Sequence, residues 1–244
     1  MNVWGLTDPG MVRKQNQDAF HTERLGEECL LAVVCDGMGG AKSGNVASRL
    51  ATDVFTEEVK RSFSPEKTPE EAERVLYNAV KLANITVYEH SLISEEFSGM
   101  GTTLVACLIY PRAILVINVG DSRAYHFSTD GVKCVTTDHS VVEMMVRRGE
   151  LTPEEAKNHP SKNVITRAVG TAPTVEADVF RVKAGRGDCL LLCSDGLSNL
   201  MADEEMLFEV AHGAKLDDCC QRLLEIAKDR GAPDNVTAVL INLT

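Results

Sequence analysis

The fold of this chain is decided by two stretches, VVCDGMGG at residues 33–40 and LLCSDG at residues 191–196. Each is an apolar run that ends in Asp-Gly, and an apolar run of this length is typical of a buried strand. A carboxylate at a strand tip, followed by a glycine that can turn sharply and expose its carbonyl, is suited to bind a hard cation. Asp-Gly alone is also a common turn, so the prediction of a metal-centred site depends on acids elsewhere.

Further acids occupy predicted strand ends or turns, and the full set is Asp18, Asp36, Asp121, Asp195 and Asp234. Taken singly, each is more often a turn residue than a ligand, but their joint occurrence favours a shared site. Carboxylates and a glycine carbonyl are hard oxygen donors, which suit Mg²⁺ or Mn²⁺. The six histidines show no metal-ligand spacing, so a zinc hydrolase is not expected. A two-metal oxygen site suits hydrolysis of a phosphate ester.

Arg13 is the candidate for holding the phosphate, because a guanidinium can bind two phosphate oxygens at once. An isolated arginine is more often a solvated surface charge, but this one precedes Asp18 by five residues, so one loop could hold both. The glycines at 37–40 match neither glycine-rich nucleotide-binding motif. Nucleotide binding is therefore not expected.

Composition excludes several classes of protein. The 244 residues include 36 Asp and Glu against 25 Lys and Arg, for a net charge of −11. This balance argues against nucleic acid or an anionic membrane as the main partner. There is no apolar run of about 18 residues and no signal-peptide pattern at the N-terminus. The eight cysteines are scattered without a two-residue gap, which favours reduced thiols in the cytoplasm over a disulfide framework.

Hydrophobic periodicity predicts strands, two long helices, strands again, and a helix before the last strand. The strands are expected at residues 2–8, 29–35, 103–110, 113–119, 122–127, 132–135, 175–182, 189–193 and 236–242. The helices are expected at 41–62, from Thr68-Pro69 onward, and up to about Gly231. The runs between 103 and 135 are expected to form one antiparallel meander, and 140–165 an excursion from the sheet. Segregated blocks predict an α+β fold of antiparallel sheets with helices outside, as a single domain over 1–244.

Eight short phrases follow one another along the chain. They are RKQNQD (13–18), DGMGG (36–40), GMGTT (99–103), GDSRAY (120–125), DHS (138–140), TRAVG (166–170), SDGL (194–197) and DNVT (234–237). In this order and spacing the chain resembles the metal-dependent serine/threonine protein phosphatases of type 2C, the PPM family, in their compact bacterial form. The resemblance covers about residues 7–243. It implies a β-sandwich flanked by antiparallel helix pairs (four layers, α/β/β/α), with metals in a cleft at one end and residues 140–165 as a flap beside it.

The resemblance also implies roles for the residues at the metals. Asp36 would bridge two metals, and the Gly37 carbonyl would bind one of them. Asp195 and Asp234 would complete the site of the other metal. Together with Arg13, these three aspartates are the expected catalytic residues.

Four more positions receive roles in the same way. Asp18 would hold metal-bound water, and Arg13 would hold the substrate phosphate. Asp121, with Asp195, would bind a third and weaker metal, and Asn235 would orient the Asp234 turn.

Two positions depart from parts of the family. Animal members carry a histidine directly after the first Asp-Gly, proposed as the acid that protonates the leaving group, and here that residue is Met38. Many bacterial members carry a histidine directly after the double glycine, and here that residue is Ala41. The loop therefore contains no histidine. Our hypothesis is that water on the third metal, near Asp121, supplies the proton.

The expected function is a monomeric, cytoplasmic Mn²⁺- or Mg²⁺-dependent phosphatase for phosphoserine and phosphothreonine in proteins, opposing a serine/threonine kinase. Metal-bound hydroxide would attack phosphorus in line, without a covalent phosphoenzyme. Two alternatives stay open. One is a pseudophosphatase that binds without turnover, which the complete set of acids disfavours. The other is a hydrolase of small phosphoesters, which only the resemblance disfavours.

Overall fold

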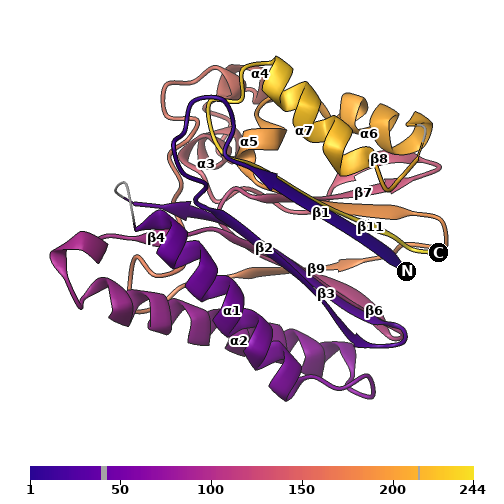
Figure 1. Cartoon of the computed structure of the whole chain (residues 1–244), viewed down its shortest axis with the longest axis horizontal. Helices are drawn as coiled ribbons and strands as arrows, with labels where there is room; N and C mark the ends of the chain where they lie inside the picture. The colour runs from indigo at the N-terminus through magenta and orange to yellow at the C-terminus, as the bar shows by residue number, and fades with distance from the viewer. Residues whose placement is uncertain (40–42, 214) are drawn as a thin grey trace.

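The computed structural model describes residues 1–39, 43–213 and 215–244. Gly40, the end of the first Asp-Gly stretch, and Ala41, which follows it, lie outside the described residues. Within them, two antiparallel sheets pack face to face, and a pair of helices covers the outer face of each sheet (Figure 1). The predicted α+β sandwich of four layers is confirmed.

The order of strands is β1-β11-β10-β7-β8 in one sheet and β2-β3-β5-β6-β9 in the other, with β4 paired to the end of β3. The strands are β1 (Asn2–Asp8), β2 (Asp18–Gly26), β3 (Cys29–Met38), β4 (Gly101–Thr102), β5 (Leu104–Tyr110), β6 (Ala113–Val119), β7 (Arg123–Ser128), β8 (Gly131–Cys134), β9 (Asp178–Val182), β10 (Cys189–Cys193) and β11 (Val236–Asn242). The helices are α1 (Gly44–Ser62), α2 (Pro69–Ser91), the 3₁₀ turn η1 (Glu95–Phe97), α3 (Val141–Arg147), α4 (Pro153–Lys157), α5 (Asp195–Ser198), α6 (Asp203–His212) and α7 (Cys219–Asp229).

The apolar parts of the two Asp-Gly stretches belong to β3 and β10, which are central strands covered on both faces. In β3, Leu31 and Val33 face the helices α1 and α2, whereas Leu30 and Val34 face the other sheet. In β10, alternate leucines divide in the same way between α7 and the opposite sheet. A strand that is covered on both sides needs a continuous apolar run, which is why these stretches do not alternate with polar residues.

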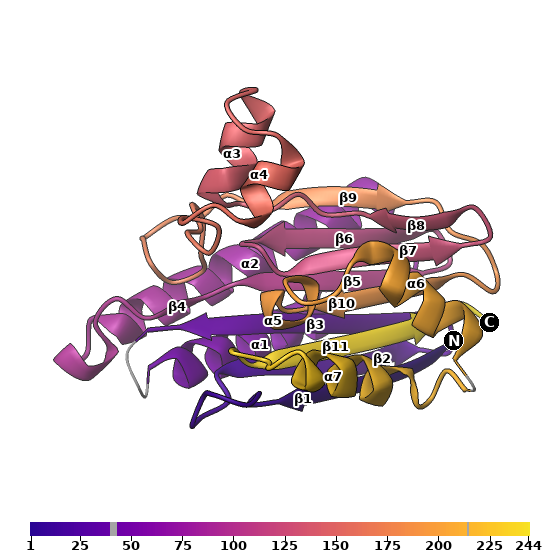
Figure 2. The same cartoon turned by 90° about the horizontal axis from the view of Figure 1, so that it is seen from above.

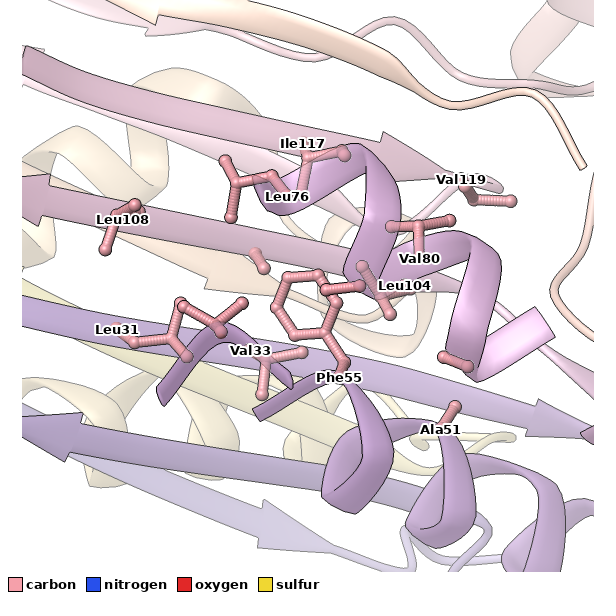
Figure 3. Close-up of a cluster of buried hydrophobic side chains, with 14 of the residues drawn as sticks. Leu31, Val33, Ala51, Phe55, Leu76, Val80, Leu104, Leu108, Ile117 and Val119 are labelled. Atoms are coloured by element: carbon pink, nitrogen blue, oxygen red, sulfur yellow. The ribbon is translucent and has the colours of Figure 1, made fainter. Parts of the chain in front are cut away.

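The helices α1 and α2 close the core on one side. Phe55 of α1 lies among Leu31 and Leu104, and Leu76 of α2 lies near Ile117 of β6 (Figure 3). All five side chains are fully buried, and burying each contributes roughly 1.5–3 kcal/mol. This packing holds β3 rigidly along its length and so fixes the position of its tip.

Several elements differ from the sequence prediction. The expected meander is split, because β5 and β6 belong to one sheet while β7 and β8 belong to the other. The strand β2 was not predicted, since it is an edge strand with polar, half-exposed residues. The single helix expected before the last strand is two helices, α6 and α7, and β9 begins at Asp178, not at 175.

The helices α3 and α4 project beyond the sandwich (Figure 2). They lie within residues 140–165, for which the sequence suggests a flap. That role, and the treatment of 1–244 as one domain, stay predictions. None of the described helices has both the length and the apolar character needed to span a bilayer.

Candidate functional site

The predicted site residues meet at one end of the sandwich. Asp18 at the start of β2 is paired with Asp36 near the end of β3. Asp195 begins α5, which follows β10 after Ser194, and Asp234 precedes the neighbouring strand β11. One cavity of about 300 Å³ is lined by Arg13, Asp36, Gly37, Asp121, Asp195 and Asp234, among others. Asp18 and Asn235 are buried and do not belong to this lining.

The two Asp-Gly glycines allow backbones to pack closely. A Cβ on Gly37 would collide with the carbonyl oxygens of Gly44 and Gln17, and one on Gly196 with the carbonyl oxygen of Asn235. Neither glycine is in the left-handed region. The sequence predicted that these glycines make a sharp turn. In the structure, glycine is needed because no side chain fits between the closely packed backbones.

Asp18 is a buried carboxylate that is held by one of its two oxygens. Its Oδ2 accepts hydrogen bonds from Ser194 Oγ at 2.7 Å and Thr237 Oγ1 at 2.6 Å. Its Oδ1 is buried without a hydrogen-bond partner among the described residues. Burial raises the pKa of Asp18 to about 6, although the two hydroxyls counteract this effect. A buried acceptor without a donor fits a site that takes a cation or its water.

The acids in the cavity wall disfavour one another's charge. Burial raises the pKa of Asp36 well above its usual value, and the charges of Asp18, Asp195 and Asp121 add to the rise. Burial and the charge of Asp195 likewise raise the pKa of Asp121 to about 7. The pKa of Asp195 is raised by burial and by Asp234. Such a cluster needs positive charge to hold its carboxylates ionised at neutral pH.

The acids surround the cavity without forming a closed cage. Among the described residues, no three acids, histidines or cysteines form a group that could hold a metal ion as they stand. The Asp234 carboxylate is directed to Arg13, whose Nη2 donates to Asp234 Oδ2 at 2.8 Å. That contact also raises the pKa of the guanidinium, so Arg13 stays charged. The sequence placed Arg13 near Asp18, and the structure brings it to Asp234.

Asn235 joins the loop of Arg13 to the turn of Asp234. Its Oδ1 accepts from Gln17 N at 2.8 Å, and its Nδ2 donates to the carbonyls of Pro9 and Gln15 at 2.9 and 3.0 Å. Its backbone N–H donates to Asp234 Oδ1 at 2.9 Å. These contacts fit the orienting role that the sequence suggested.

Two threonines of the phrase GMGTT have no role that the sequence predicted. Thr103 Oγ1 accepts from Asp36 N at 2.9 Å and lies 2.7 Å from Ser122 Oγ, next to Asp121. Thr102 Oγ1 donates to the Asp36 carbonyl at 2.8 Å. The pair therefore fixes the backbone of Asp36 and ties it to the Asp121 turn. Their position in the phrase GMGTT was the available signal.

Comparisons with known proteins identify the family of the chain. Residues 12–240 match the family described as Protein phosphatase 2C. The chain is 35% identical over 235 residues to the serine/threonine phosphatase stp of Listeria innocua, covering 96% of this chain and 93% of that protein. The structure of the S. agalactiae serine/threonine phosphatase matches with a TM-score of 0.93 and 32% identity over 100% of this chain and 99% of that one.

A further similar structure is the catalytic domain of the serine/threonine protein phosphatase PstP, solved in complex with two manganese ions. It has a TM-score of 0.84 and 31% identity, covering 98% of this chain and 96% of that one. The chain therefore belongs to the protein phosphatase 2C family and is a serine/threonine protein phosphatase.

Proposed function

We propose that the cavity removes phosphate from phosphoserine and phosphothreonine side chains of other proteins, at a centre of two Mn²⁺ or Mg²⁺ ions. The observation that carries the proposal is the convergence of Asp36, Asp121, Asp195 and Asp234 on one cavity, with Arg13 at its edge. The donors are all oxygens, which suits hard cations. The relative solved with two manganese ions supports this choice of metal.

The residues divide the work as follows. Asp36 and the Gly37 carbonyl would hold the ions at one end, and Asp195 and Asp234 at the other. When bound, such ions neutralise the phosphoryl charge and lower the pKa of a bound water. The unpartnered Oδ1 of Asp18 is the acceptor that we assign to a water beside the ions.

Arg13 would exchange its bond to Asp234 for two oxygens of the substrate phosphate. The exchange frees the Asp234 carboxylate to turn towards a cation, so substrate and metal sites would be completed together. Asp121, with Asp195, would take a third ion. Among the described residues, no histidine lines the cavity. Our hypothesis is therefore that water on the third ion, near Asp121, would protonate the leaving group.

A serine/threonine kinase must make the phosphoesters that this reaction hydrolyses. We propose that the protein opposes such a kinase. We further propose that it acts as a cytoplasmic monomer. All eight cysteines are free and most are buried, and burial raises the pKa of Cys35 and Cys107 to about 12. Unreactive thiols of this kind suit a reducing compartment.

The test is turnover of a phosphothreonine peptide with Mn²⁺, with EDTA, and by Asp195→Ala. We expect EDTA to abolish turnover and the substitution to lower it at least about 100-fold, because a metal ligand acts in the transition state. Asp130→Ala, in an exposed turn, is the matched control. Turnover that survives EDTA would refute the metal centre. A metal-loaded protein without turnover would indicate the pseudophosphatase, and turnover of small phosphoesters alone would indicate the small-molecule hydrolase.

A further inference from the structure

Two large apolar side chains are exposed in the loop that carries Arg13. Met11 is 62% exposed and Val12 is 68% exposed, and they directly precede Arg13, which lines the cavity. The loop between β1 and β2 that carries them lies at the same end of the sandwich as α5 (Figure 1). Single exposed apolar residues are ordinary, but an adjacent pair next to a ligand-binding residue calls for a reason.

The exposure does not result from a loosely held loop. Met11 N donates to the Ala232 carbonyl at 2.9 Å, and Asn235 Nδ2 holds the Pro9 carbonyl. Gly10 adopts a φ of +76°, and a Cβ there would collide with the Asp234 carbonyl oxygen. The backbone is therefore fastened to the turn before β11, and this fixed backbone holds both side chains outward.

Apolar surface also lies elsewhere around the same acids. Met38 and Ile165 line the cavity, and Val164 is 50% exposed. When a phosphorylated side chain is bound at Arg13, polar groups of the cavity would bind its phosphate. Apolar groups would face the residues that flank it in the substrate. Met11 and Val12 directly precede Arg13, and consecutive residues are about 3.8 Å apart, so we expect a residue flanking the phosphorylated one to lie near this pair.

We propose that Met11 and Val12 bind an apolar side chain adjacent to the phosphorylated residue of the substrate protein, and so select phosphosites with apolar neighbours. The inference rests on the proposed function, since it needs a phosphoprotein at Arg13. Burial of the pair against the substrate removes apolar surface from water on both partners. The selection should appear in KM, because this contact is distant from the reacting bond and forms equally in the ground and transition states.

The experiment uses two phosphothreonine peptides that differ only in the residues on both sides of the phosphothreonine, which are Leu in one and Ser in the other. The enzymes are the wild type, the double variant M11S/V12S, and the double variant L92S/I93S. Leu92 and Ile93 are the matched control, since they are 68% and 70% exposed after the end of α2, away from the cavity lining. Turnover of p-nitrophenyl phosphate, which has no flanking residues, reports on the reacting centre alone.

We expect the wild type and L92S/I93S to favour the Leu peptide by about fivefold or more in kcat/KM, a ratio typical of one partly buried apolar contact. M11S/V12S should lose this preference through a higher KM for the Leu peptide. Its turnover of the Ser peptide and of p-nitrophenyl phosphate should stay within about twofold of the wild type.

Three results would overturn the inference. One is a wild type without preference, and another is a preference that M11S/V12S retains. The third is an equal loss on both peptides and on p-nitrophenyl phosphate, which would show that the substitutions disturb the Arg13 loop. If the wild type turns over p-nitrophenyl phosphate but neither peptide, the proposed function itself fails and the inference with it.

Discussion

At the scale of a single residue, Arg13 joins the proposed phosphate site to Asp234, a proposed metal ligand. Because it is half-exposed in its ion pair with Asp234, Arg13→Ala should change the free energy of unfolding by less than about 1 kcal/mol. The same substitution should lower kcat/KM on a phosphothreonine peptide by about 100-fold, since a two-oxygen contact to phosphate is lost. Arg13→Lys should recover part of this activity as a point charge, and Lys14→Ala serves as the control. An Arg13→Ala protein that is strongly destabilised yet keeps its KM would assign the residue a structural role.

The sequence predicted the charged residues of the candidate site but not the groups that hold them. Asp36 and Asp195 were visible because each ends an apolar run. The hydroxyls of Ser194 and Thr237 reach the Asp18 carboxylate from the side of the opposite sheet. The hydroxyl of Thr103 accepts from the backbone N–H of Asp36. Contacts between distant segments leave no spacing pattern in the sequence. Polar residues within or directly beside buried strands were the available signal, because buried polar groups need partners.

At the scale of elements, Glu205 near the start of α6 is joined to Arg230 at the end of α7. The two side chains form two hydrogen bonds, of 2.6 and 2.8 Å, and Ala202 N donates to Glu205 Oε2 at 2.9 Å. The contact with Arg230 is the main reason that the pKa of Glu205 falls from 4.5 to about 2. Glu205→Gln should cost up to about 1 kcal/mol at pH 7, since the pair is exposed and screened by water.

This cost should depend on pH with a defined sign. The folded pKa is below the unfolded one, so the stabilisation is fully present above pH 4.5 and is lost as pH falls through about 2. Urea unfolding of the wild type and of Glu205→Gln should therefore give a difference at pH 7 that shrinks by pH 2. Glu204→Gln, at an exposed neighbouring position, should show no such trend. A difference that is constant with pH would mean that packing, and not the charge of Glu205, joins the helices.

Local signals explain which elements the sequence predicted. The start of α2 was predicted because Thr68 and Glu71 form a capping box. The start of α6 has Ala202 in the equivalent place, so no hydroxyl marked it. The assignment of β7 and β8 to the other sheet depends on the pairing of β7 with β10. Such long-range pairs decide which sheet a strand joins, and the alternation of apolar and polar residues within one strand does not encode them.

At the scale of the whole molecule, the sandwich brings distant segments to one end. The strands β3 and β10 are central in separate sheets, and their Asp-Gly ends lie at the same end of the stack (Figure 2). The interior between the two sheets is apolar and disfavours charged side chains, so the carboxylates lie where the strands end. The arrangement concentrates like charges in one cavity wall, which opposes folding until a cation is present.

Cation binding should therefore stabilise the entire fold. A ligand that binds only the folded state at 100 times its dissociation constant adds about 2.7 kcal/mol. For a domain of this size that corresponds to a rise in Tm of about 5–10 °C, which EDTA should reverse. Asp36→Asn should lose the rise, and in EDTA it should melt above the wild type because a repelling buried carboxylate is gone. NaCl at matched ionic strength separates metal binding from charge screening. An equal rise in Tm with NaCl, or a full rise with Mn²⁺ in Asp36→Asn, would contradict a metal site at the tip of β3.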